Sequence, residues 1–79
     1  MNNLEKYNKV YVDLFGIPAD QVGDSLTALT VEKWDSVAQM NLAAALEEAF
    51  DIFLDPEDVI ELVSYAKGKA VLQKHGIEF

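Results

Sequence analysis

The segment SVAQMNLAAALEEAF, residues 36–50, constrains the fold of this chain more than any other feature. It is rich in strong helix formers, and Asp35 directly before it is a good N-cap, so the sequence predicts a helix that begins at Ser36. On a helical wheel of residues 35–53, one side is apolar, which predicts that it faces a core. The residues of that side are Leu42, Leu46, Ala49 and Phe53, flanked by Phe50, Ala43 and Ala45.

A first helix is predicted over residues 2–15, where apolar residues recur at helical spacing. Asn2 or Asn3 can serve as its N-cap, and Gly16 is a typical stop signal. Residues 16–34 show no clean period and contain glycine and proline, so we expect a long loop with one helical turn. The apolar residues that can pin this loop to a core are Val22, Leu26, Leu29 and Val31.

Two more helices follow the central one. Pro56 can occupy the first turn of a short helix, and Ser64 can cap a last helix that ends near His75, with Gly76 as a C-terminal signal. No stretch alternates with a period of two, which argues against strands. The sequence therefore predicts an all-α fold: one domain over residues 1–79, a small four-helix bundle with a long loop between helices one and two.

Composition limits the possible functions. The chain has 79 residues and a formal net charge of -8, and its basic residues other than histidine are all lysine, which makes nucleic acid an unfavourable partner. There is no cysteine, and neither a signal-peptide-like run nor a segment of membrane-spanning length is visible. We expect a monomeric cytoplasmic protein with no membrane association.

Acidic residues are concentrated between Lys33 and Lys67, an interval without any basic residue. Such an interval forms either a solvated surface or a docking surface for basic partners. Calcium is a third possibility, but Asp51, Asp55 and the acids after Pro56 lack the ligand order of an EF-hand, so no metal site is predicted.

The pair Asp-Ser occurs twice, at Asp24-Ser25 and Asp35-Ser36. The first lies in the tetrapeptide GDSL, which also occurs in a class of serine hydrolases. A hydrolase needs a histidine base that an acid positions, and this chain has one histidine, His75, which we interpret as an exposed helix-end residue. Ser25 is therefore interpreted as a loop or capping serine.

The second pair, Asp35-Ser36, is part of a longer sequence pattern. It is followed by LEEAF, residues 46–50, then by DIFLDPED and a closing helix. In this the chain closely resembles the acyl carrier protein family, in which an Asp-Ser-Leu motif opens the second of four helices. Val37 stands where leucine is usual, and the sequence WDS around Trp34 is more similar to carriers of specialised pathways than to the fatty-acid carrier.

The resemblance implies that Ser36 carries 4'-phosphopantetheine, transferred from coenzyme A by a phosphopantetheinyl transferase, and that Asp35 helps to present it. The residues that it implies for docking partner enzymes are Val37, Met40, Ala44, Glu47 and Glu48. Those partners would be an acyl- or aminoacyl-loading ligase and acyltransferase or synthase enzymes, and the carrier itself would catalyse nothing. The alternative is an unmodified acidic helical module that binds a partner through the same face.

Overall fold

The computed structural model describes residues 2–79 and is mostly helical. Its elements are α1 (Asn3–Phe15), the 3-10 turn η1 (Ala19–Gln21), α2 (Ser36–Phe50), α3 (Pro56–Ile60) and α4 (Tyr65–Lys74). No strand forms among the described residues, where the one β-type pairing is an isolated bridge between Thr27 and Ser64. The predicted all-α class is therefore confirmed.

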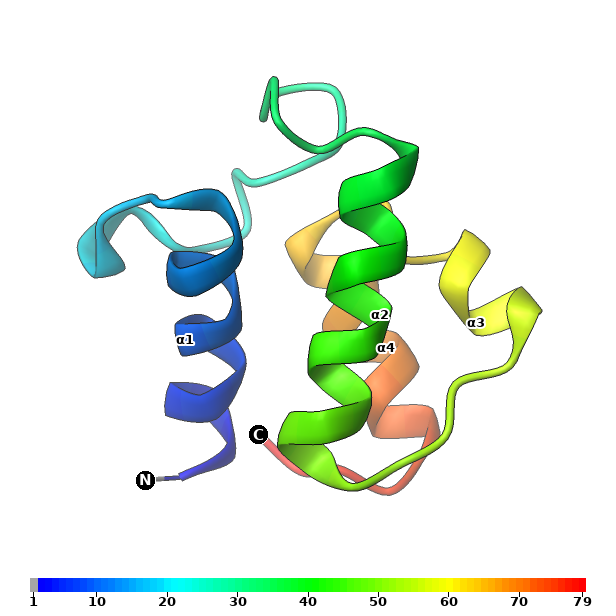
Figure 1. Cartoon of the computed structure of the whole chain (residues 1–79). Helices are drawn as coiled ribbons and strands as arrows, with labels where there is room; N and C mark the ends of the chain where they lie inside the picture. Colours follow the sequence, from blue (N-terminus) through cyan, green and yellow to red (C-terminus); the bar gives the residue numbers. More distant parts are fainter. Residues whose placement is uncertain (1) are drawn as a thin grey trace.

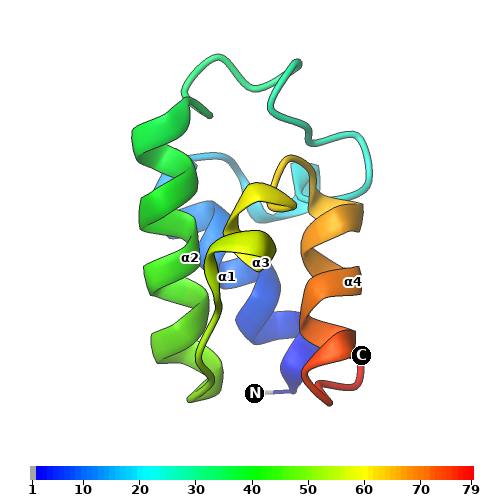
Figure 2. The ribbon, with the colours of Figure 1, turned by 90° about the vertical axis from the view of Figure 1, so that its right-hand side faces the viewer.

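The three longer helices run side by side, and both ends of the chain lie at the same end of the molecule (Figure 1). α3 lies between α2 and α4 on the side away from α1, and the connection between η1 and α2 arches over the opposite end of the molecule (Figure 2). None of the helices in residues 2–79 combines the length and the apolar character needed to cross a membrane.

Local capping sets the helix boundaries much as the sequence predicts. The Asn2 side chain accepts a hydrogen bond from the Glu5 amide, and the Glu5 side chain accepts one from the Asn2 amide, which completes a capping box. At the other end of α1, Gly16 adopts φ 66°, a left-handed conformation that glycine reaches without strain. Ser64 caps α4 through the Lys67 amide.

Two apolar residues do not lie where the sequence pattern places them. Asp51 takes a left-handed conformation with φ 53° and ends α2 at Phe50, so Phe53 leaves the helical wheel and is 78 % exposed. Leu29 lies in a loop turn and is 98 % exposed, whereas Leu26 is buried and anchors that loop. The predictions that Phe53 and Leu29 face the core are therefore wrong.

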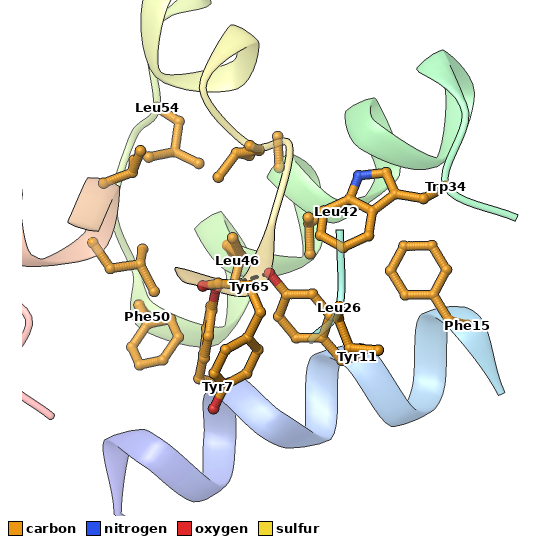
Figure 3. Packing of buried hydrophobic residues seen from close by; sticks show 14 residues of the cluster. Tyr7, Tyr11, Phe15, Leu26, Trp34, Leu42, Leu46, Phe50, Leu54 and Tyr65 are labelled. Carbon is orange, nitrogen blue, oxygen red and sulfur yellow. Dashed lines mark hydrogen bonds between the residues drawn. The ribbon is translucent and has the colours of Figure 1, made fainter. Parts of the chain in front are cut away.

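A cluster of buried tyrosines joins α1 to α4 (Figure 3). The Tyr7 hydroxyl donates a hydrogen bond to the Tyr65 carbonyl at 2.6 Å and lies 2.8 Å from the Tyr11 hydroxyl. Because a phenol has one proton, Tyr11 is the donor in that second contact. Burial is the main cause that raises the pKa of Tyr7 and of Tyr11 above the ordinary value, so both phenols stay neutral hydrogen-bonding groups.

Gly68 in α4 is required by this cluster. A Cβ atom at this position would overlap the Tyr7 hydroxyl and lie 3.0 Å from the Tyr11 hydroxyl. From the sequence, Gly68 looks like a residue that merely weakens its helix. In the structure it is buried and lets α1 and α4 approach each other closely.

Gly68→Ala should destabilise the protein although alanine is the better helix former. Overpacking of a dense core costs about 1–3 kcal/mol, which exceeds the gain of about 1 kcal/mol in helix propensity. Urea unfolding of Gly68→Ala should therefore show a lower midpoint. Gly23→Ala is the matched control because a Cβ atom at Gly23 meets nothing within 4 Å.

The double variant Tyr7→Phe/Gly68→Ala identifies the cause of this loss. Tyr7→Phe removes the hydroxyl that the new methyl group meets, so the cost of Gly68→Ala should be smaller in that background. An equal cost of Gly68→Ala in both backgrounds would show that the tyrosine contact is not what requires glycine.

Candidate functional site

Ser36 is exposed and occupies the first position of α2. The Asp35 carboxylate accepts a hydrogen bond from the Ala38 amide at 2.8 Å, and the Asp35 carbonyl accepts one from the Gln39 amide at 2.9 Å. The N-cap is therefore as predicted. The first amides of any helix lack intrahelical acceptors and favour a negative charge, so a phosphodiester on Ser36 would be compatible with this position.

Trp34 anchors in the core the segment that leads to Ser36. Its ring is buried, with its centroid 5.1 Å from that of Phe15 and 5.7 Å from that of Tyr11. The indole N–H is buried and has no hydrogen-bond partner within residues 2–79, so packing alone holds the ring. Trp34 thus closes the long loop against the helices, and Ser36 lies two residues after this core anchor (Figure 3).

Four of the five predicted docking residues form one exposed strip along α2. Val37 and Met40 are each 67 % exposed, and Ala44 and Glu48 are exposed further along the helix. Glu47 differs, because it is half-buried and its carboxylate accepts a hydrogen bond from the Leu54 amide at 2.8 Å. Glu47 therefore stabilises the loop that leads to α3.

A small hollow lies beside Ser36 at the junction of α2 and α3. It has a volume of about 210 Å³ and is lined by Ser36, Gln39 and Met40 of α2 and by Val59 and Ile60 of α3. Ile60 is 70 % exposed, so it adds apolar surface to the strip that Met40 provides. The sequence pattern on α2 alone does not reveal the contribution of α3.

Gln39 ties the two walls of this hollow together. Its amide nitrogen donates to the Val59 carbonyl at 2.6 Å and lies 3.3 Å from the Ile60 carbonyl. Carbonyls in the last turn of a helix have no intrahelical partner, so the Gln39 side chain caps the C-terminal end of α3.

Asp58 of α3 is a buried carboxylate that the sequence did not distinguish from its solvated neighbours. It is 1 % exposed, and its two oxygens lie 2.6 Å from Lys74 Nζ and 2.7 Å from His75 Nε2. Hydrogen bonds from Lys74 and then His75 lower the pKa of Asp58 to about 2. His75 ends α4, as predicted, but it is half-buried against Asp58, so the prediction that it is exposed is wrong.

Ser25 lies in an exposed turn, where its carbonyl accepts a hydrogen bond from the Thr30 hydroxyl. The hydrogen bonds of residues 2–79 do not connect Ser25 with His75, whose ring nitrogen is engaged by Asp58. The surroundings of Ser25 thus resemble those of an ordinary turn serine. Across the same residues, no group of three or more histidine, aspartate or glutamate side chains could hold a metal ion.

The alanines of α2 do not open the core. Ala43 is buried in it, whereas Ala45 and Ala49 line a surface groove of about 460 Å³ between α1 and α2, together with Val10 and Leu14. This groove does not include Ser36. Of these alanines, Ala43 therefore fills the core, while Ala45 borders open space only at the surface.

Comparison with known proteins found no matching family model, no matching curated protein and no matching solved structure.

Asp35→Ala should destabilise the protein by about 1 kcal/mol, because it removes the side chain that caps the Ala38 amide. Asp35→Asn keeps a capping oxygen and should remain close to wild type. Ser36→Ala serves as the control, since no hydrogen bond of its side chain supports the fold in the described part of the chain. Urea unfolding followed by circular dichroism measures all three.

The difference in unfolding free energy between wild type and Asp58→Asn should depend on pH. The folded-state pKa of Asp58 is lowered from 3.8 to about 2, so the stabilisation is fully present above about pH 5 and is lost as pH falls through 2. Denaturant titrations between about pH 6 and about pH 2 should show the two stabilities converging. A difference that stays constant over this range would contradict the role of the Asp58 carboxylate.

Proposed function

We propose that this chain is a carrier protein that holds acyl or aminoacyl intermediates as thioesters on 4'-phosphopantetheine attached to Ser36. The observation that supports it best is the position of Ser36: exposed, at the start of α2, and next to an apolar strip formed by Val37 and Met40. An enzyme that modifies Ser36 needs access to the hydroxyl and surface to bind, and this position provides both.

The residues around Ser36 are compatible with such a group. The first amides of α2 favour a phosphate, and the hollow lined by Met40 and Ile60 offers apolar surface beside the attachment point. When attached, the group would supply the thiol that this cysteine-free chain lacks. The chain's own residues would hold and present it: Asp35 by capping α2, and Trp34 by anchoring the loop.

The partners in this proposal are a phosphopantetheinyl transferase, an acyl- or aminoacyl-loading ligase, and acyltransferase or synthase enzymes. Val37, Met40 and Ala44 would provide contact area for them. The net charge of -8, with Glu48 exposed on the same helix, would favour the approach of partners with basic surfaces. Tethering would raise the concentration of the thioester at whichever enzyme is bound.

Incubation with coenzyme A and a transferase of broad specificity tests the proposal. Intact mass spectrometry should show the addition of one phosphopantetheine to wild type and to Ser25→Ala, and none to Ser36→Ala. Ser25→Ala is the matched control because Ser25 also follows an aspartate and is also exposed. Folded wild type that gains no mass with several transferases would instead support an unmodified interaction module that uses the same face.

A further inference from the structure

A groove follows the line of contact between α1 and α2, two helices that run side by side in opposite directions (Figure 1). It consists of two adjoining hollows, of about 460 Å³ and about 300 Å³. Val10, Asp13 and Ala49 line both hollows, and Leu14 and Ala45 line the larger one. The apolar residues among these are half-buried. The groove therefore has an apolar floor that no other part of residues 2–79 covers.

Alanine at two positions of α2 keeps this groove open. Ala45 and Ala49 are one helical turn apart, and larger side chains at these positions would fill the space beside α1. Ser36 precedes Ala45 by nine residues, which at about 100° per residue places the two on opposite faces of α2. The groove thus lies away from the hollow beside Ser36, to which α3 contributes one wall.

The two halves of the groove differ in charge. Lys6 lines the smaller hollow, and Glu48 lines the larger one. Neither side chain forms an ion pair within residues 2–79, whereas Lys9 and Asp13 pair with each other at 2.7 Å. Lys6 Nζ lies 5.5 Å from the centroid of the Phe50 ring. One cation and one acid, in different halves of the groove, are therefore left for a partner to pair with.

The surroundings of the groove favour a helix as its occupant. The space between two packed helices accepts the side-chain ridge of a third helix, as in helical bundles. The backbone groups along α1 and α2 are bonded within their own helices, so an extended peptide would find no main-chain partners there. A second copy of the chain is disfavoured, because two grooves do not fill each other and each copy has a net charge of -8.

We propose that this groove binds an amphipathic helix of a partner protein, which places a basic residue beside Glu48, an acidic residue beside Lys6 and apolar side chains on the floor. Because the groove and Ser36 lie on opposite faces of α2, the bound helix leaves the serine exposed. One protein can then hold the chain while a second one reaches Ser36. This inference goes beyond the proposed function and does not rest on it.

An NMR titration of the unmodified chain with a synthetic peptide tests the groove. The peptide has about 14 residues and a side-chain staple, since free peptides of this length are only marginally helical. It has leucine at positions i, i+3, i+4 and i+7, a lysine and a glutamate about two turns apart beside them, and glutamine elsewhere. At millimolar peptide, amide signals of residues that line the groove should shift, among them Leu14 and Ala45. The Met40 signal should not.

Filling the groove should prevent this binding. Ala45→Leu places a larger side chain in the groove and should weaken binding about tenfold or more, because it occupies the centre of the interface. Ala44→Leu is the matched control, since it makes the same change at an exposed position outside the groove and should alter binding by less than about twofold. If Ala45→Leu does not fold, Ala49→Leu replaces it, because Ala49 lines both hollows.

A double-mutant cycle tests the expected charge pair. Replacing the peptide lysine by glutamine should weaken binding to wild type about twofold to fivefold, the range of exposed ion pairs. The loss should be much smaller with Glu48→Gln, in which the facing carboxylate is absent. Glu57→Gln is the matched control, because it removes an exposed acid from α3 and should behave as wild type does.

Three results would overturn the proposal. The first is the absence of shifts at millimolar peptide. The second is a set of shifts centred on Val37 and Met40, which would place the helix on the strip beside Ser36. The third is a set of groove shifts that grow with protein concentration alone, which would assign the groove to a second copy. Failure of Ser36 to accept phosphopantetheine would leave all these titrations unaffected.

Discussion

The contact of the Tyr7 hydroxyl with the Tyr65 carbonyl, made possible by Gly68, is the constraint on which the remaining structure depends. It joins the first helix to the last one in the dense interior, where a misplaced atom is costly. Tyr11 continues this aromatic packing to Trp34, and Trp34 lies two residues before Ser36. The position of Ser36 therefore depends on aromatic packing that starts between the first and the last helix, far from Ser36 in the sequence.

The charge pattern of α2 separates two surfaces. From Ser36 to Leu46 the helix contains no charged residue, whereas its last turn contains Glu47 and Glu48. Glu47 uses its carboxylate to hold the loop to α3, so Glu48 is the acid that this turn presents freely to solvent. For the proposed carrier, contact close to the serine would be apolar, while the acids further away would act at long range.

Helix boundaries that depend on adjacent residues could be predicted from the sequence. Contacts between residues far apart in the sequence could not. The helix starts at Asn3 and Ser36 follow from caps, which depend on a few adjacent residues. An acid such as Asp58 in a first helical turn looks the same whether water or a cation surrounds it, and its partners Lys74 and His75 come from another helix. Likewise, the wheel placed Phe53 in the core because it could not anticipate that Asp51 would end the helix.

The hollow beside Ser36 thus has two walls, which differ in how firmly the rest of the protein holds them. α2 forms the firm wall, since Leu42 and Leu46 are fully buried and fix its orientation. α3 forms the weaker wall, because a single helical turn has no stability of its own and relies on Pro56, its caps and contacts with its neighbours. Those contacts are polar and come from side chains on two other helices. The serine therefore lies between a wall fixed by apolar burial and a wall fixed by polar contacts, namely the hydrogen bonds of Gln39 and the ion pairs of Asp58.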